Sequence, residues 1–225
     1  PDAAEVLAHW RDHGIPDPAV EDGAERGGWF QALPADPGLY VAWERVPAEG
    51  QAVEVYVAAA YGKDLQAARA AAEEEISRAA EAGYVALEEA EALWWRRYWG
   101  RTAALVVPDA TLQEAYDLGM YKLAGIASPG APPATLQGPW VEEHRMPPWS
   151  GDYHFNINVQ ECYWPAYAGN HLEMLAPLFH MLASWQPHLR AVAREFLGVE
   201  DGLMLHHAVD DRGTCMGGFW TGAID

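Results

Sequence analysis

The stretch Trp149-Ser-Gly-Asp-Tyr-His-Phe-Asn-Ile-Asn-Val-Gln-Glu-Cys-Tyr-Trp-Pro-Ala-Tyr-Ala-Gly-Asn170 decides how the rest of this chain is interpreted. It gathers asparagines, carboxylates, a histidine and aromatic rings, with glycines that let the backbone turn sharply. Aromatic rings stack on the apolar C–H faces of a sugar, while fixed amides and acids pair with its hydroxyl groups. The run is too polar and too irregular to form only a hydrophobic core. It therefore predicts a carbohydrate site.

The acidic composition of the chain restricts its partners. Its 225 residues, 50% of them hydrophobic, are enough for one large globular domain or two small ones. The 14 basic and 33 acidic residues give a net charge of -19. Nucleic acids and anionic membranes attract Lys and Arg, so we expect neither as a partner. The charge disfavours a polyanionic substrate and leaves a neutral sugar unaffected, and plain solubility is its simplest role.

The cysteines and the opening residues say little about the compartment. Cys162 and Cys215 are too few for a disulfide framework and lack the CxxC spacing of a zinc site. No apolar run approaches the length of about 18 residues that a bilayer requires. The opening residues lack the basic and then apolar pattern of a signal peptide. We expect a soluble protein, whether secreted, periplasmic or cytoplasmic.

The first 62 residues carry the strand signals. A short helix is predicted over residues 4–13, followed by a loop rich in Gly, Asp and Pro. Apolar and polar residues then alternate over 39–44 and again over 53–57, which predicts two half-buried strands. Pro47-Ala-Glu-Gly50 between them is typical of a hairpin turn. Because two strands are not stable alone, we expect them to belong to a larger sheet.

Helical periodicity dominates from residue 63 onward. One helix is predicted to end before Gly83, with its buried face formed by Leu65, Ala68, Ala72, Ile76 and Ala79. The acidic run 73–75 is interpreted as a solvated face. A second helix over 87–99 carries Trp94, Trp95, Tyr98 and Trp99, which we interpret as packing residues more than ligand contacts.

The residues after Pro108 predict successive helices joined by structured loops. Thr111-Leu-Gln-Glu114 fits a capping box, and Leu112, Ala115, Gly119, Leu123 and Ile126 then follow one face until the loop 128–133. Asn170-His-Leu-Glu173 resembles another cap. Pro187 is expected to begin a third helix and Gly198 to close it. Strands followed by helices predict two packed units, not a wound α/β sheet.

The asparagine pair in Asn156-Ile-Asn158 suits the control of a water molecule. Residues two apart share a face of an extended segment but not of a helix, so joint action requires an extended or looped stretch. An amide can orient water, but proton removal needs a carboxylate, and the local ones are Asp152 and Glu161. Inverting glycoside hydrolysis uses such a water on one face of the sugar and an acid on the other. Structural loop asparagines are the alternative.

Several separated motifs together resemble one enzyme family. They are Thr135-Leu-Gln-Gly-Pro-Trp140, Trp149-x-x-Asp-Tyr-His-Phe-Asn-Ile-Asn-Val-Gln, Tyr163-Trp-Pro165, Asn170-x-x-Glu173 with Pro177-Leu178, and Leu205-His-His207. In this order they resemble the glycoside hydrolase family 95 α-L-fucosidases. The similarity covers roughly residues 64–225 and is strongest over 136–178. Glu161 and Cys162 depart from the family's usual residues, which bears on the sugar that is accepted.

The resemblance implies a mostly α-helical fold in three parts. Residues 1–62 would be the C-terminal part of a β-sandwich domain, 63–107 a helical linker, and 108–225 the first part of an (α/α)6 barrel catalytic domain. It also implies a neutral carbohydrate substrate and neither a metal nor an organic cofactor. The chain would then be an internal fragment that ends before the family's general acid and its water-activating aspartate.

The resemblance also assigns roles to individual residues. Asn156 and Asn158 would position the attacking water. The residues expected to contact the sugar are Trp149, His154, Glu161, Trp164 and His207. Loop packing is an equal alternative for Trp140 and Trp149. For His154 and His171, hydrogen bonding within loops is the preferred interpretation over contact with a ligand. The adjacent His206 and His207 point to different sides and lack a third ligand at metal spacing, so we expect no metal there.

These observations favour an inverting glycoside hydrolase of α-L-fucosidase type that acts on neutral glycans. A non-catalytic carbohydrate-binding protein, or a degenerate barrel that kept the site without its acid, is the main alternative. A phosphorylase or a sugar epimerase on the same barrel is a third reading. Few basic residues lie near the motif, which argues against a phosphate site.

Overall fold

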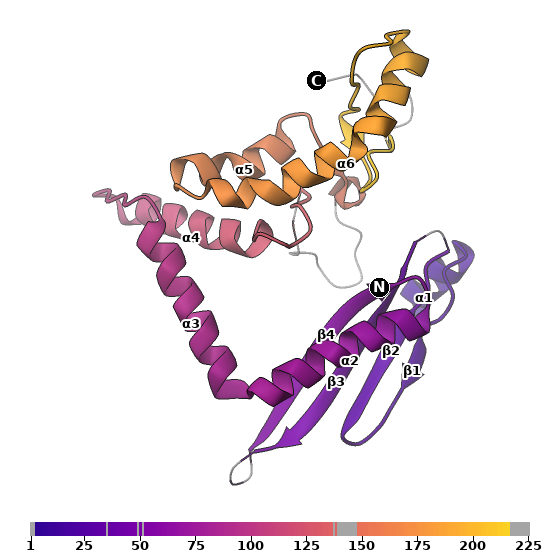
Figure 1. Cartoon of the computed structure of the whole chain (residues 1–225), viewed down its shortest axis with the longest axis vertical. Coiled ribbons are helices and arrows are strands. Elements are labelled where there is room, and N and C mark those ends of the chain that lie inside the picture. The colour runs from indigo at the N-terminus through magenta and orange to yellow at the C-terminus, as the bar shows by residue number, and fades with distance from the viewer. Residues whose placement is uncertain are drawn as a thin grey trace. The chain divides into compact units, whose positions relative to one another are not determined.

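The computed structural model describes residues 3–34, 36–48, 50, 52–136, 138 and 148–216. About half of these residues lie in helices, and the strands form small antiparallel sheets. The chain divides into two compact units, Pro1–Arg97 and Tyr98–Asp225, whose elements are labelled in Figure 1. Among the described residues, no helix is both long and apolar enough to cross a membrane.

Four antiparallel strands form the sheet of the first unit. They are β1 (Ala19–Glu21), β2 (Arg26–Gln31), β3 (Gly38–Pro47) and β4 (Val53–Gly62), in that order across the sheet. The predicted hairpin is confirmed, since Pro47 pairs with Val53 on either side of the expected turn.

The prediction of a loop before this hairpin was wrong, because that stretch contains β1 and β2. Its glycines hide the strand pattern, and cross-strand packing explains why they are there. Gly28 pairs with Ala42, and a Cβ atom at Gly28 would lie 2.5 Å from the Tyr40 hydroxyl. The glycine therefore gives the Tyr40 side chain its room in the sheet.

Helix α2 (Leu65–Ala82) covers one face of this sheet, as Figure 1 shows. The Asp64 carboxylate caps its start by accepting a hydrogen bond from the Ala67 amide at 2.9 Å. The predicted buried face is confirmed, and the core consists of Tyr40, Ala42, Tyr56, Ala68, Ala72 and Ile76. The acidic run 73–75 is exposed, as expected. Small alanines on α2 let the helix approach the strands closely.

The opposite face of the sheet is largely bare within this unit. Val53, Val55, Val57 and Tyr61 of β4 are 57%, 57%, 66% and 69% exposed. Helix α1 (Ala3–Asp12), close to the predicted 4–13, contributes Trp10 to a groove of about 500 Å³ on this face. Trp29, Leu39 and other apolar side chains complete the groove.

Helix α3 (Tyr84–Arg101) and helix α4 (Ala110–Ile126) follow in the chain. The predicted capping box at Thr111 was wrong, because Asp109 caps α4 and accepts hydrogen bonds from the Thr111 and Leu112 amides. The predicted buried face is correct only in part. Leu123 is buried as expected, but Leu112 is 61% exposed, and the other buried side chains of α4 are Met120 and Ala124. Contact with the next helix, not the apolar count, decides which face is covered.

The remaining helices of the second unit are α5 (Asn158–Ala168) and α6 (Ala176–Val192), with short helical turns η1 (Pro148–Gly151), η2 (Leu172–Leu175) and η3 (Ala193–Leu197). Helix α5 lies close to α4 at Gly169, where a Cβ atom would lie 2.1 Å from the Met120 methyl group. A two-stranded ladder joins β5 (Tyr153–His154) to β6 (Ala208–Val209).

Two further helix predictions were corrected. Pro187 lies inside α6 instead of starting a helix, because Trp185 and Leu189 on either side of it are both buried and hold the helix together. Asn170 does not cap a helix; its amide donates a hydrogen bond to the Arg101 carbonyl at 3.1 Å. The closing glycine was correct, since Gly198 has a left-handed φ of 67°.

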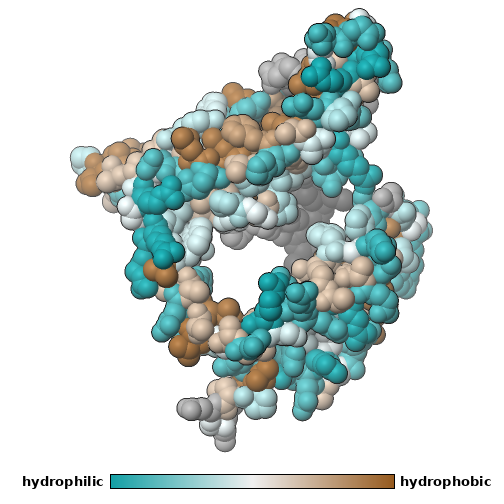
Figure 2. Space-filling view, viewed as in Figure 1, coloured by the Kyte–Doolittle hydropathy of each residue, from teal (hydrophilic) through white to brown (hydrophobic). Residues whose placement is uncertain are grey.

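Apolar side chains remain exposed on the helices of this unit. Figure 2 shows hydrophobic residues gathered over α5 and α6. Trp164, Leu172 and Phe179 are between 53% and 56% exposed. The helices therefore bury only part of their apolar surface against each other.

Candidate active site

A sharp backbone turn places the aromatic side chain at the start of the predicted site. Trp149 and Ser150 both have left-handed φ values, 50° and 60°, followed by Gly151 at 66°. Non-glycine residues rarely adopt this conformation, and such turns concentrate at functional sites. The Asp152 amide closes the turn by donating to the Trp149 carbonyl at 3.2 Å. The Trp149 side chain is 63% exposed.

The ladder of β5 and β6 brings two histidines together from distant parts of the chain. The Phe155 amide donates to the His207 carbonyl at 2.6 Å, which extends the pairing of His154 with Ala208. The rings of His154 and His207 then lie edge to face, with centroids 5.3 Å apart. Three predicted sugar contacts are therefore neighbours, because the Trp149 ring also stacks on His154 at 5.0 Å and 18°. We call Trp149, Asp152, His154 and His207 the aromatic cluster.

Asp152 is the buried member of this cluster. Its side chain is 4% exposed, and Oδ2 is 3.3 Å from Nδ1 of His154. Oδ1 is buried and has no hydrogen-bond partner among the described residues. Nearly all buried polar atoms in native proteins have a partner, and a buried water is the expected partner of such an oxygen. Nδ1 of the neighbouring His206 is also buried, and no partner for it lies within the described part of the chain.

The two asparagines lie on either side of a left-handed residue. Asn156 is exposed in the turn before α5, Ile157 has a φ of 75°, and Asn158 is the first residue of the helix and half-buried. The segment is thus looped, as joint action of the two amides requires, instead of a regular helix. The adjacent carbonyl of Phe155 is occupied, since it accepts a hydrogen bond from the Gln160 amide group at 2.9 Å.

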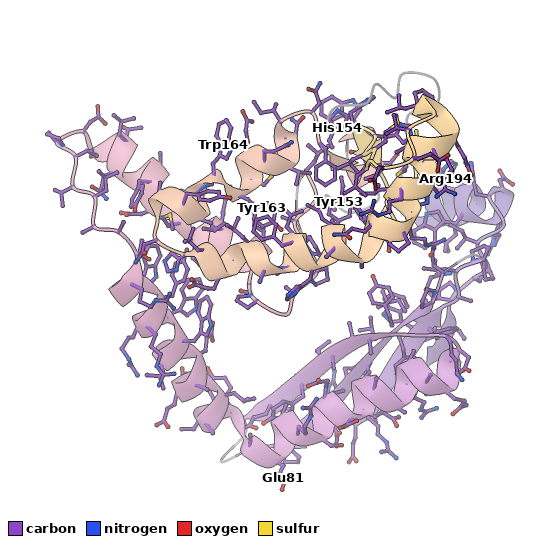
Figure 3. All side chains as sticks on the ribbon, turned by 45° about the horizontal axis from the view of Figure 1, so that its top comes forward. Glu81, Tyr153, His154, Tyr163, Trp164 and Arg194 are labelled. Atoms are coloured by element: carbon purple, nitrogen blue, oxygen red, sulfur yellow. The ribbon has the colours of Figure 1, made fainter. Side chains whose placement is uncertain are left out.

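Glu161 and Trp164 lie along α5, and both are exposed. Within the described part of the chain, no ring contact joins Trp164 to the aromatic cluster. Figure 3 shows Trp164 on the outer side of α5 and Tyr163 turned into the unit. The structure therefore groups Trp149, His154 and His207, but not these two residues. Trp140 lies outside the described residues.

Two buried tyrosines hold the loop that precedes the site. The Tyr163 hydroxyl accepts from the Ala134 amide at 2.8 Å, and the Tyr153 hydroxyl donates to the Pro133 carbonyl at 3.0 Å. Burial raises the pKa of Tyr153 to about 12, with nearby Tyr163 and Asp211 adding to the effect. Both tyrosines stay protonated at neutral pH, which keeps these loop contacts intact.

His171 forms a second polar cluster at the other end of the unit. It is completely buried, with Nε2 2.8 Å from the Thr102 hydroxyl and Nδ1 3.2 Å from Glu173. Its ring stacks on Tyr98 at 4.0 Å, and Glu173 also pairs with Arg101 at 3.1 Å. Both ring nitrogens have partners, which agrees with the interpretation of His171 as a hydrogen-bonding residue.

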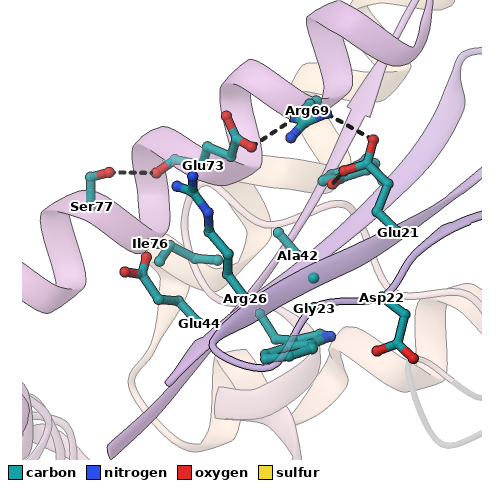
Figure 4. A pocket seen from close by; sticks show the side chains of 13 residues that line it. Glu21, Asp22, Gly23, Arg26, Ala42, Glu44, Arg69, Glu73, Ile76 and Ser77 are labelled. Atoms are coloured by element: carbon teal, nitrogen blue, oxygen red, sulfur yellow. Dashed lines mark hydrogen bonds and ion pairs between the residues drawn. The ribbon is translucent and has the colours of Figure 1, made fainter. Parts of the chain in front are cut away.

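A cavity of about 310 Å³ in the first unit contains none of the predicted site residues. Figure 4 shows Arg69 at its edge, paired with Glu21 at 2.7 Å and with Glu73 at 2.8 Å. Tyr40 donates a hydrogen bond to the same Glu21. These pairs connect α2 to β1, and their partial exposure makes them weak stabilisers.

Metal ligands do not converge in the described part of the chain, where no group of three His, Cys, Asp or Glu side chains could hold an ion. The aromatic cluster presents rings and ring nitrogens. Groups of this kind can stack on and hydrogen-bond to a polar, non-ionic ligand.

The comparison with known proteins places this cluster in a family. The glycosyl hydrolase family 95 catalytic domain matches residues 95–221, more than half of the chain. A probable alpha-fucosidase A of Aspergillus niger is 34% identical over 99 residues, 44% of this chain and 12% of the relative. Alpha-L-fucosidase 2 of Arabidopsis thaliana is 33% identical over 112 residues, 47% of this chain and 13% of the relative.

The chain spans only about an eighth of the length of either relative in these alignments. The matched residues 95–221 nevertheless contain the whole aromatic cluster and both asparagines. The resemblance found in the motifs is confirmed: the chain belongs to glycosyl hydrolase family 95.

Proposed function

We propose that this protein is an inverting glycoside hydrolase of α-L-fucosidase type that acts on neutral glycans. The observation that carries the proposal is the aromatic cluster, in which Trp149 stacks on His154 above a buried Asp152 with an unpaired oxygen. The names of both relatives support fucose as the sugar. The net charge of -19 fits a neutral substrate.

We assign the water-holding role to the two asparagines. Asn156 is exposed in the turn, and the left-handed Ile157 separates it from Asn158. Amides donate and accept hydrogen bonds but do not take a proton, so the base is a carboxylate. By resemblance, that aspartate and the general acid glutamate lie later in the catalytic domain than residues 95–221. Glu161 and Trp164 on α5 would contact the more distant part of a glycan.

The architecture that goes with this function is a sandwich followed by a barrel. In this proposal residues 1–62 belong to a β-sandwich, 63–107 to a helical linker, and 108–225 to an (α/α)6 barrel. The bare valine face of β4 supports the sandwich, because such a face packs against a second sheet. The exposed apolar side chains on α5 and α6 support further helix packing, as a barrel provides.

Release of L-fucose by the complete gene product tests the proposal. The probe is 4-nitrophenyl α-L-fucoside, with the corresponding α-D-galactoside as a control. Asn156→Ala should lower kcat about 100-fold with little change in KM, because an oriented water matters mainly in the transition state. Gln186→Ala, which removes an exposed amide from α6, should leave kcat unchanged.

Two outcomes would redirect the assignment. An unchanged kcat in Asn156→Ala would remove the water-holding role from that residue. Binding of L-fucose without turnover would favour the alternative of a non-catalytic carbohydrate-binding protein. Turnover that requires inorganic phosphate would identify a phosphorylase instead of a hydrolase.

A further inference from the structure

The contact between Asp152 and His154 gives the two nitrogens of the imidazole ring different surroundings. Nδ1 faces the buried carboxylate at 3.3 Å. Nε2 has no hydrogen-bond partner among the residues that the structure describes. The side chain of His154 is 15% exposed, so most of the ring is covered. The His207 ring on one flank and the Trp149 ring on its face leave little freedom to rotate.

The chemistry of the carboxylate decides where the proton of the neutral imidazole lies. An ionised carboxylate only accepts hydrogen bonds, so the ring nitrogen beside it must be the donor. Protonation at Nδ1 leaves a lone pair on Nε2, which then accepts a hydrogen bond. A carboxylate that fixes the tautomer of a ligand-binding histidine is a recurring arrangement in protein sites. Sugar hydroxyl groups are donors that such a nitrogen recognises.

We propose that Asp152 is a positioning residue that holds the proton of His154 on Nδ1, so that Nε2 accepts a hydrogen bond from a sugar hydroxyl group. The proposal rests on the assignment of the aromatic cluster as a sugar site. It gives Asp152 a role that is exerted through His154, without contact between Oδ2 and the sugar. Burial makes Asp152 well suited to this role, because its side chain is 4% exposed and water competes little for Oδ2.

A purely structural Asp152 would behave differently from a positioning one. A structural carboxylate would affect the stability of the turn at residues 149–152, whatever the tautomer of His154. A positioning carboxylate controls the tautomer and the affinity for sugar, even when the fold is intact. The location of the imidazole proton is therefore the deciding observable.

The experiment uses the complete gene product labelled with 15N in histidine. His154→Gln identifies the signals of His154 by their disappearance. In the wild-type protein we expect Nδ1 to be protonated, and in Asp152→Asn we expect the proton to move toward Nε2. The dissociation constant for L-fucose, measured by calorimetry, should rise about 10- to 100-fold in Asp152→Asn. Asp211→Asn, which changes an exposed carboxylate in the same unit, should alter neither quantity.

A double variant separates positioning from other effects. If Asp152 acts through His154, Asp152→Asn should cause no further loss of affinity in the His154→Gln background. Independent losses in the two single variants would contradict the proposal. The tautomer of the wild-type protein decides the matter even if Asp152→Asn does not fold, because a proton on Nε2 would overturn it directly.

The result also distinguishes this inference from the proposed function. A wild-type protein with the proton on Nδ1 that does not bind L-fucose would refute the fucosidase assignment alone. The affinity measurements would then be repeated with D-galactose, D-xylose and D-glucose. Failure to bind any neutral sugar would refute the role of Nε2 as well.

Discussion

The aromatic cluster and the His171 cluster (Tyr98, Arg101, Thr102, His171 and Glu173) contain the same kinds of residues. The two clusters differ in how many of their polar atoms have hydrogen-bond partners. His171 is completely buried, and both of its ring nitrogens have protein partners. Among the residues that the structure describes, His154 has a partner on Nδ1 only, and the Asp152 carboxylate beside it has one buried oxygen without a partner. Both histidines stack on an aromatic ring: His171 on the buried Tyr98, and His154 on Trp149, which is 63% exposed.

This difference separates a structural histidine from one that is available for binding. A buried polar group that is fully paired contributes to stability, and removing it leaves its partners unpaired. A buried polar group with unpaired atoms lowers the stability of the fold. Such groups persist at functional sites, where a ligand or a water can complete their hydrogen bonds. In the proposed assignment, His154 is the histidine that is available to a sugar, and His171 is a structural one.

The largest expected effect is on stability, in His171→Ala. This change removes a buried, stacked ring, and it takes one hydrogen-bond partner each from Thr102 and from the partly exposed Glu173. The free energy of unfolding should fall by about 3 kcal/mol, as for other losses of buried, hydrogen-bonded side chains. Urea denaturation of the complete protein measures it, and a change below about 1 kcal/mol would remove the structural role.

The second effect is on binding and activity, in His154→Gln. The fucosidase kcat/KM of the complete protein should fall about 30-fold, because one hydrogen bond to the sugar is lost. The urea midpoint should fall less than in His171→Ala, since the amide of Gln can still donate a hydrogen bond to Asp152. A large loss of stability with normal kcat/KM would reverse the roles of the two clusters.

Trp149→Ala should have a smaller and more selective effect. Its ring is mostly exposed, so we expect a change in the free energy of unfolding within about 0.5 kcal/mol. Loss of stacking on the sugar should raise KM about 10-fold with kcat little changed. Tyr167→Ala on α5 is the matched control, because that ring is 59% exposed and lies outside the aromatic cluster. Equal effects of the two changes would show that the cluster has no special role.

The smallest effect concerns alkaline pH and the ring that stacks on His171. Burial, with help from Tyr116 and Glu173, raises the pKa of Tyr98 to about 12 from 10.0. The unfolded state thus loses its proton first, and the stability that depends on neutral Tyr98 is present below pH 10 and declines between pH 10 and 12. Tyr98→Phe should make the decline in unfolding free energy shallower over this range, while Tyr153 maintains part of it. An unchanged slope would show that Tyr98 does not titrate with folding.

Regular periodicity made part of the fold predictable. The alternation over 53–57 and the helical spacing of Ala68, Ala72 and Ile76 are repeated signals, and both predictions were correct. Strand β2 was missed because Gly28 has no side chain to show alternation, although the close approach of Tyr40 requires a glycine. Signals from single residues were least informative where tertiary packing determines the extent of a helix, as at Pro187 within α6.

The residues of the candidate site were proposed from the sequence, whereas most of the contacts between them could not be predicted from it. Trp149 and His154 lie close in sequence, so their stacking is compatible with a local turn. The meeting of His154 with His207 depends on the ladder between β5 and β6, which joins segments about fifty residues apart and leaves no local pattern. The pairing of Asp152 with His154 has a signal in hindsight, because residues two apart share one face of an extended segment.

The stereochemistry of sugar release tests the central claim most directly. The complete gene product is mixed with 4-nitrophenyl α-L-fucoside in an NMR tube, and the anomeric proton signals of the released fucose are followed from the first minutes. The account predicts that β-L-fucose appears first and that the α anomer grows later by mutarotation, because a water held by Asn156 and Asn158 attacks with inversion. Early appearance of α-L-fucose, or no release of fucose at all, would contradict it.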